Sequence, residues 1–148
     1  MRIRHLLALA VAVLPVVLTP TAAHADTRFH SDSGDSCRYG STDGVLSTRL
    51  NLVVIRGTLT DRPTLADPTN CRDDGFFSVA TFTAFLGDRV IDQQAVRADN
   101  AIVRVELALG QNATAVRIDR VVVQVCRSPI VTLPPSYCGR PADYRAPF

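Results

Sequence analysis

The fold class is decided by one stretch, VRVELAL at residues 103–109. Its valines and leucines alternate strictly with Arg104, Glu106 and Ala108, so every second side chain is apolar. A β-strand places successive side chains on opposite faces of a sheet, whereas an amphipathic helix needs apolar residues three and four positions apart. The stretch therefore predicts a strand with one face on a hydrophobic core.

Segments before this stretch give further strand signals. Residues 76–86 are rich in aromatic and β-branched side chains, which is typical of a strand covered on both faces or lying in the centre of a sheet. Gly87 and Asp88 are expected to turn the chain into a second strand at residues 89–97, forming a hairpin. Residues 45–56 also alternate with a period of two. The chain therefore contains several strand candidates separated by turn signals.

Two irregularities are expected in these strands. Gly57 is predicted to form a bulge, after which residues 58–60 continue the strand of residues 45–56. The apolar positions of residues 113–126 change parity at Asp119–Arg120, which indicates a bulge or two successive strands. Within the predicted strand at residues 45–56, the side chains expected to face the core are Leu46, Leu50, Leu52 and Val54.

Strands spaced by turn signals, with no convincing amphipathic helix, predict an all-β protein. We expect an antiparallel β-sandwich, with an immunoglobulin-like layout favoured over a barrel. The chain has no tryptophan, so the buried strand tryptophan of antibody domains is absent. We expect residues 26–44 to be an irregular N-terminal arm, residues 45–139 the β-sandwich domain and residues 140–148 a C-terminal tail.

Residues 1–25 have the three parts of a signal peptide. Arg2 and Arg4 form a basic start, 13 apolar residues follow from Leu6, and the small-residue ending predicts cleavage after Ala25. A membrane anchor is the competing interpretation, but this run contains Pro15 and is shorter than the about 20 apolar residues that a spanning helix needs. We therefore predict a secreted, extracellular protein with no membrane span after signal cleavage.

The charge of the chain argues against binding to nucleic acid. Two of its 16 basic residues lie in the predicted leader, which leaves 14 arginines against 14 acidic residues. A neutral chain without a basic run lacks the positive field that nucleic-acid binding requires. The lysine-free composition, rich in arginine, alanine and valine, resembles that of proteins from GC-rich bacteria.

Four cysteines follow the leader, and an exported chain meets an oxidising environment. We therefore expect two disulfides, Cys37 with Cys71 and Cys126 with Cys138, because the second pair closes a short ring. A crossed pairing of Cys71 with Cys126 remains open. A metal site is not expected, because the chain has no Cys-x-x-Cys motif and His30 is the one histidine after the leader.

The sequence predicts no catalytic residue and no cofactor. His30 is expected to be a solvated residue near the new amino terminus, and a Gly-x-Ser-x-Gly motif is missing. Two acidic pairs, Asp32 with Asp35 and Asp73 with Asp74, lie beside glycines. Such aspartates usually form turns, although they could bind calcium loosely or serve a small carboxylate-dependent glycan hydrolase.

The ring from Cys126 to Cys138 is the most suggestive stretch. A disulfide that closes a proline-rich loop lowers the ordering cost of binding a partner. Residues 132–136, TLPPS, resemble the Bowman-Birk protease-inhibitory loop, which implies a protease inhibitor as an alternative function. The ring is longer than the inhibitory ring of that family, and Pro134 directly follows Leu133 in the matched segment. The candidate interaction residues are Arg127, Ile130, Leu133, Pro134 and Tyr137.

Abundant strand patterns without a chemical signature predict a protein that acts through its surface. We expect a non-enzymatic extracellular binding module or an envelope-associated structural module, whose partner is an extracellular protein or a glycan. The protease inhibitor and the glycan hydrolase are the alternatives from other functional classes.

Overall fold

A computed structural model describes residues 26–35, 39–61, 75–111, 117–131 and 136–146. Over these residues the chain forms strands and no helix. The nine strands are β1 (Thr27–Asp32), β2 (Gly40–Arg49), β3 (Leu52–Asp61), β4 (Phe76–Leu86), β5 (Arg89–Ala98), β6 (Ala101–Leu109), β7 (Arg120–Pro129), β8 (Tyr137–Cys138) and β9 (Ala142–Arg145). The all-β prediction is therefore confirmed.

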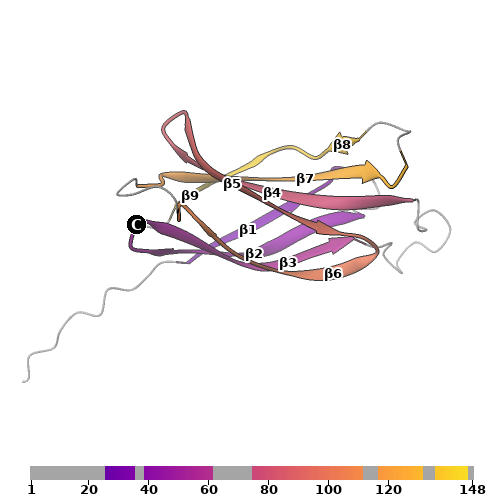
Figure 1. Cartoon of the computed structure of the whole chain (residues 1–148), viewed down its shortest axis with the longest axis horizontal. Helices are drawn as coiled ribbons and strands as arrows, with labels where there is room; N and C mark the ends of the chain where they lie inside the picture. The colour runs from indigo at the N-terminus through magenta and orange to yellow at the C-terminus, as the bar shows by residue number, and fades with distance from the viewer. Residues whose placement is uncertain (1–25, 36–38, 62–74, 112–116, 132–135, 147–148) are drawn as a thin grey trace, which may run out of the picture.

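The strands form two antiparallel sheets that pack face to face (Figure 1). The four-stranded sheet has the order β1-β2-β3-β6, and the five-stranded sheet has the order β5-β4-β7-β8. Strand β9 also pairs with β7, so β8 and β9 lie one after the other along the same edge of β7. The predicted sandwich of antiparallel sheets is thus present.

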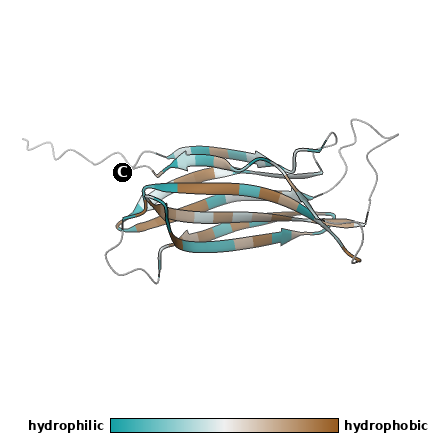
Figure 2. Cartoon of the chain, turned by 90° about the horizontal axis from the view of Figure 1, so that it is seen from above, coloured by the Kyte–Doolittle hydropathy of each residue, from teal (hydrophilic) through white to brown (hydrophobic). Residues whose placement is uncertain are grey.

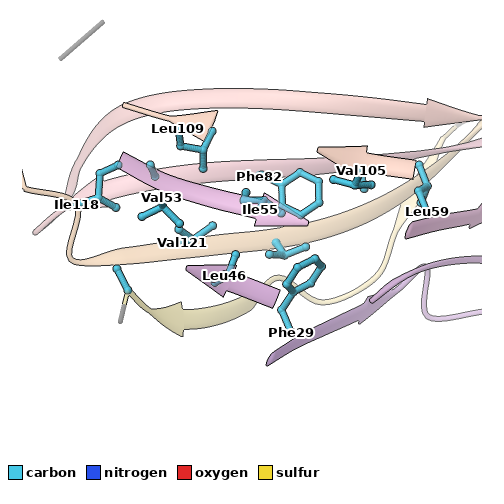
Figure 3. Packing of buried hydrophobic residues seen from close by; sticks show 14 of the residues in the cluster. Phe29, Leu46, Val53, Ile55, Leu59, Phe82, Val105, Leu109, Ile118 and Val121 are labelled. Atoms are coloured by element: carbon cyan, nitrogen blue, oxygen red, sulfur yellow. The ribbon is translucent and has the colours of Figure 1, made fainter. Parts of the chain in front are cut away.

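Alternating apolar side chains of both sheets fill the space between them (Figure 3). Phe82 of β4 is fully buried and packs edge to face against Phe29 of β1, with ring centroids 5.7 Å apart. Ile55 of β3 and Val105 of β6 are also fully buried, from the other sheet than Phe82. Each such side chain contributes about 1.5–3 kcal/mol by leaving water, so this layer stabilises the stacking of the sheets.

The strand predictions that are confirmed lie in the middle of the chain. β4 occupies residues 76–86 between β5 and β7, as expected for a central strand. The predicted hairpin with β5 is present. In β6, Val105 and Leu109 are fully buried, while Arg104 and Glu106 are exposed.

The predicted single strand at residues 45–56 is wrong, because the chain reverses at Leu50 and Asn51. Arg49 pairs with Leu52 across this two-residue turn, and Leu50 has a φ of 55° with 93% of its surface exposed. The reversal changes which residues face inward: Val53 and Ile55 are buried in place of Leu52 and Val54. A positive φ at the first turn position is typical of hairpins, but the residue there is usually glycine or asparagine. Because leucine occupies this position, the sequence contains no turn signal here.

The bulge predicted at Gly57 is also wrong, because β3 pairs with β2 without a shift of register. Gly57 lies opposite Gly44, and a Cβ atom added to Gly57 would lie 2.1 Å from the carbonyl oxygen of Asp43. The glycine thus allows two backbones to approach closely within a continuous strand.

Strands extend beyond both predicted ends of the domain. The arm of residues 26–44, predicted to be irregular, contains β1 and the first half of β2, and the tail contains β9. Both segments contain many polar residues on their outer faces, which obscured the alternation in the sequence. Phe29 of β1 faces the core, and Tyr144 of β9 packs against the core, with the Phe29 and Tyr144 ring centroids 6.3 Å apart. The predicted tail therefore contributes a side chain that packs against the core, and residues 147–148 lie outside the described residues.

The predicted strand at residues 113–126 is displaced toward the C-terminus. β7 begins at Arg120, where the parity of the apolar residues changes, and it continues to Pro129. Residues 117–119 precede the strand, yet Ile118 is fully buried. Residues 112–116 lie outside the described residues.

Side chains bridge the two open sides of the sandwich. On one side the hydroxyl of Tyr144 accepts a hydrogen bond from the backbone N–H of His30 at 2.9 Å and donates one to the carbonyl of the same residue. On the other side the amide of Gln94 in β5 donates to the carbonyl of Ala108 in β6 at 2.9 Å. The outer backbone groups of β1 and β6 therefore have partners at these positions.

Candidate functional site

The disulfide between Cys126 and Cys138 is present, as predicted. The two residues are direct cross-strand partners of β7 and β8, with Cα atoms 3.9 Å apart. The ring does not begin as a loop, because β7 pairs with β4 as far as Pro129. Cys37 and Cys71 lie outside the described residues, so their predicted pairing stays a prediction.

The residues predicted for the interaction loop separate into two environments. Ile130 and Tyr137 are 54% and 37% exposed, whereas Arg127 is only 2% exposed. Arg127 points between the sheets from β7, so it is not a surface contact residue of the ring. Leu133 and Pro134 lie outside the part of the chain that the structure describes.

Arg127 instead belongs to a buried polar network at one end of the core. Its Nη2 lies 3.7 Å from Oδ1 of Asp61, which is equally buried. The Asp61 carboxylate also accepts hydrogen bonds from the hydroxyl of Ser78 at 2.6 Å and the backbone N–H of Asn100 at 2.9 Å. The guanidinium lies over the ring of Tyr39, 4.4 Å from its centroid. This network joins β3, β4, β7 and the turn after β5, which indicates a structural role.

The acidic pair Asp32 and Asp35 forms a turn, as the sequence favoured. Asp32 accepts a hydrogen bond from the N–H of Gly34, and Asp35 accepts bonds from the hydroxyl of Ser33 and the N–H of Tyr39. These contacts hold the connection between β1 and β2. Asp73 and Asp74 are not among the described residues, so the proposed cation or hydrolase site at these positions is untested.

His30 lies on the exposed outer face of the four-stranded sheet. Its Nδ1 is 2.6 Å from a carboxylate oxygen of Asp43, and its Nε2 is 3.6 Å from Asp32. A shallow hollow of about 450 Å³ lies beside it, between β1 and the chain that connects β8 with β9. No group of three or more potential metal-ligating side chains occurs among the residues described.

The two outer faces of the sandwich differ in charge. On the four-stranded sheet, charged side chains extend across neighbouring strands and form pairs, such as His30 with Asp43 and Arg56 with Glu106. Arg104 places a second guanidinium 3.5 Å from the same glutamate. This face is typical of a solvated surface.

The outer face of the five-stranded sheet is uncharged over its centre, and we call this area the neutral face. Along β4 the buried and half-buried residues alternate, which assigns the half-buried ones to the outside. The pairing registers of β4 with β5 and β7 place the outward residues of β5 and β7 beside the outward residues of β4. The neutral face consists of Val79, Thr81 and Thr83 of β4, Gln93 and Ala95 of β5, and Val122 and Gln124 of β7.

Arginines mark both ends of the neutral face. Arg97 stacks on Phe77, with its Cζ 3.6 Å from the ring centroid, and it pairs with Asp99 at 3.3 Å. At the other end Arg120 stacks on Phe85 at 4.1 Å and pairs with an aspartate of β9 at 2.9 Å. Each guanidinium covers an aromatic ring. Because each also pairs with an aspartate, both ends of the face present both signs of charge.

The neutral face was not predicted, although the sequence contains a signal for it. Between Phe76 and Leu86 no position is charged, on either parity. A central strand that is solvated on one side usually carries polar or charged residues on every second position. The hydropathy of the strands in Figure 2 shows how polar and apolar residues alternate across the sheets.

No family model matches the chain, and neither a curated protein nor a solved structure is significantly similar to it. Within the described residues, no helix has the length and apolar character needed to cross a membrane. Function is therefore inferred from the geometry of this chain itself.

Proposed function

We propose that the protein is a secreted, non-enzymatic binding module that engages an extracellular partner through the neutral face. The observation that carries this proposal is the difference between the two outer faces. The outer face of the four-stranded sheet carries ion pairs such as Arg56 with Glu106, whereas the outer face of the five-stranded sheet has no charged side chain at its centre.

The physical reason is the cost of removing charges from water. Burying a charged group costs several kcal/mol unless a partner compensates it. Threonine, valine, alanine and glutamine lose little on desolvation when their few polar groups find hydrogen bonds. The cores of protein interfaces are accordingly depleted in charged residues, while their rims are polar. The neutral face with Arg97 and Arg120 at its ends has this arrangement.

Two further observations support the extracellular, non-enzymatic part of the proposal. A disulfide between Cys126 and Cys138 is favoured by an oxidising compartment, which agrees with the signal peptide predicted from the sequence. The side chain of His30 contacts Asp43 and Asp32 on the open outer face of a sheet, and no Gly-x-Ser-x-Gly motif in the sequence supplies a nucleophile for it.

We also propose that the sandwich has an immunoglobulin-like layout with an added N-terminal strand. The chain crosses between the sheets after β3, β5 and β6, which gives β2-β3-β6 opposite β5-β4-β7 and the edge of β8 and β9. This order agrees with the sheets of that layout, to which β1 adds one edge strand.

The second disulfide, Cys37 with Cys71, stays part of the proposal. Gly40 pairs with Asp61, so the chain segments that lead to the two cysteines leave the same end of one hairpin. Ser78 of β4, which donates to Asp61, lies at that end as well. Peptide mapping of the unreduced protein tests this pairing, and a peptide joining Cys71 to Cys126 would contradict it.

The binding proposal is tested with a charge placed on each face. Fluorescently labelled protein is incubated with cells and secreted material of its source, next to the variants Thr81→Arg on the neutral face and Thr58→Arg on the opposite sheet. Both threonines lie in strands and point outward, so Thr58→Arg is a matched control. We expect binding to be lost in Thr81→Arg alone. Equal binding of both variants, or no binding by the parent protein, would contradict the proposal.

Catalysis is tested separately with a broad panel of peptide, ester and glycan substrates. The proposal predicts no turnover above that of a heat-denatured sample. Turnover that is abolished by Asp73→Asn or Asp74→Asn would establish the hydrolase alternative instead.

A further inference from the structure

We infer that the disulfide between Cys126 and Cys138 is a redox-sensitive switch, whose reduction by a dithiol releases β8 from the edge of β7 while the rest of the sandwich stays folded. Three features of the molecule support it, namely the peripheral attachment of β8, the separate anchoring of the chain on both sides of β8, and the accessibility of the disulfide. The inference does not depend on what binds the neutral face.

The attachment of β8 to the sandwich is peripheral. The strand consists of Tyr137 and Cys138, which are both exposed and do not belong to the hydrophobic core. The ring centroids of Tyr137 and Phe76 are 5.8 Å apart, and the hydroxyl of Ser136 donates to that of Ser128 at 2.8 Å. Water can replace exposed hydrogen bonds of this kind at little net cost. The covalent link between the two cysteines is therefore the main attachment of β8.

The chain on both sides of β8 is anchored separately. β7 pairs with β4 along its whole length, and β9 pairs with residues 120–123 at the other end of β7 (Figure 1). Between β8 and β9, the N–H of Gly139 donates to the carbonyl of Val125 at 2.9 Å, and the carbonyl of Gly139 accepts from the amide of Gln124 at 3.0 Å. Detachment of β8 therefore stops at Gly139, so the opening is local.

The disulfide is accessible to a reductant from solvent. Cys138 is exposed, whereas Cys126 is half-buried. Cys138 also lines the shallow hollow of about 450 Å³ beside His30, through which a small thiol can approach. Exposed disulfides are the labile or regulatory ones, in contrast to structural disulfides that resist reduction.

Reduction proceeds by thiol–disulfide exchange. A thiolate of the dithiol attacks Sγ of the exposed Cys138, and the electron pair of the S–S bond leaves with Sγ of Cys126, which takes up a proton. The second thiol of the reductant then displaces Sγ of Cys138 from the mixed disulfide. The protein gains two electrons and two protons as two thiols, and the reductant is oxidised to a disulfide.

Reduction changes the surface at the border of the neutral face. The edge of β7 that pairs with β8 becomes accessible, and the ring of Phe76 loses its contact with Tyr137. Cys126 lies directly opposite Val79, which belongs to the neutral face. The oxidised form thus covers a strand edge that the reduced form presents to solvent.

Hydrogen exchange followed by mass spectrometry compares the oxidised protein with the same protein treated with dithiothreitol. Loss of the disulfide should raise the exchange rate of residues 136–138 by about a hundredfold, which is the loop-closure effect for a sequence separation of 12. The amides of β3 and β4 should stay protected in both forms, because these strands lie inside their sheets. Reoxidation should restore the protection of residues 136–138.

Two variants identify which disulfide is responsible. Cys126→Ser combined with Cys138→Ser should show the fast exchange of residues 136–138 without any reductant, whereas Cys37→Ser combined with Cys71→Ser should show it only after treatment. Slow exchange in the first variant would show that hydrogen bonds hold β8 without the disulfide. A disulfide that dithiothreitol reduces only in the presence of urea, or faster exchange in β3 and β4 as well, would equally overturn a local switch.

Discussion

Replacing Asp61 by alanine should destabilise the fold more than any single change on its surface. The change removes the carboxylate 3.7 Å from the guanidinium of Arg127 and the acceptor of two hydrogen bonds, from Ser78 and Asn100. Because Arg127 is only 2% exposed, water cannot easily replace the lost charge. Breaking a buried ion pair from one side costs about 3–5 kcal/mol, which is a large part of the 5–15 kcal/mol that stabilises an average domain.

The assay is equilibrium unfolding in urea with the disulfides intact, followed by circular dichroism. A loss of about 4 kcal/mol lowers the urea midpoint by about 2 M at the denaturant sensitivity of a small domain. Glu106→Ala is the control, because this residue is 56% exposed and its ion pairs lie on the solvated face. We expect that change to cost at most about 1 kcal/mol.

A double variant separates the ion pair from general damage to the core. Asp61→Leu combined with Arg127→Met removes both charges and should be more stable than Asp61→Leu alone, since apolar pairs of similar size often replace buried ion pairs without loss. A loss of stability in Asp61→Ala no larger than that in Glu106→Ala, or simple addition of the two effects in the double variant, would show that the buried ion pair does not stabilise the fold.

Three smaller changes test the backbone geometry and the bridged sides by the same unfolding assay. Leu50→Gly should raise the unfolding free energy by about 0.5–1 kcal/mol, because a leucine at a φ of 55° is strained and this one is almost fully exposed; a loss of stability would contradict this reading of the turn. Gly57→Ala should cost at least about 2 kcal/mol, because its Cβ would lie 2.1 Å from the carbonyl oxygen of Asp43, and a neutral effect would show that the two strands can separate. Tyr144→Phe should cost about 1–2 kcal/mol through the loss of its two hydrogen bonds with His30 and should speed hydrogen exchange in β1; unchanged exchange would argue against the contact.

The central strands could be predicted from the sequence because their signals are local. β4 occupies the predicted residues, and the turn at Gly87 that follows it has the expected glycine with positive φ. In β6 the alternation of Arg104 and Glu106 with apolar residues fixes which face is buried. At these positions the local conformational preference and the tertiary packing agree.

The remaining elements depend on contacts that a single sequence does not reveal. Leu50 occupies a turn position that its own conformational preference disfavours, because the pairing of β2 with β3 determines where the chain reverses. Arg127 looked like a surface residue because its partner Asp61 is 66 positions away in the chain. The neutral face likewise emerges only when the registers bring outward residues of three strands together.

The hydroxyl of Tyr144 and the amide of Gln94 have a consequence for how the molecule can polymerise. Exposed strand margins invite incoming strands, and repeated addition in that direction produces cross-β fibrils. Here one side chain on each flank engages backbone groups that an incoming strand would need. The addition of a foreign strand is therefore hindered at His30 on the edge of β1 and at Ala108 on the edge of β6.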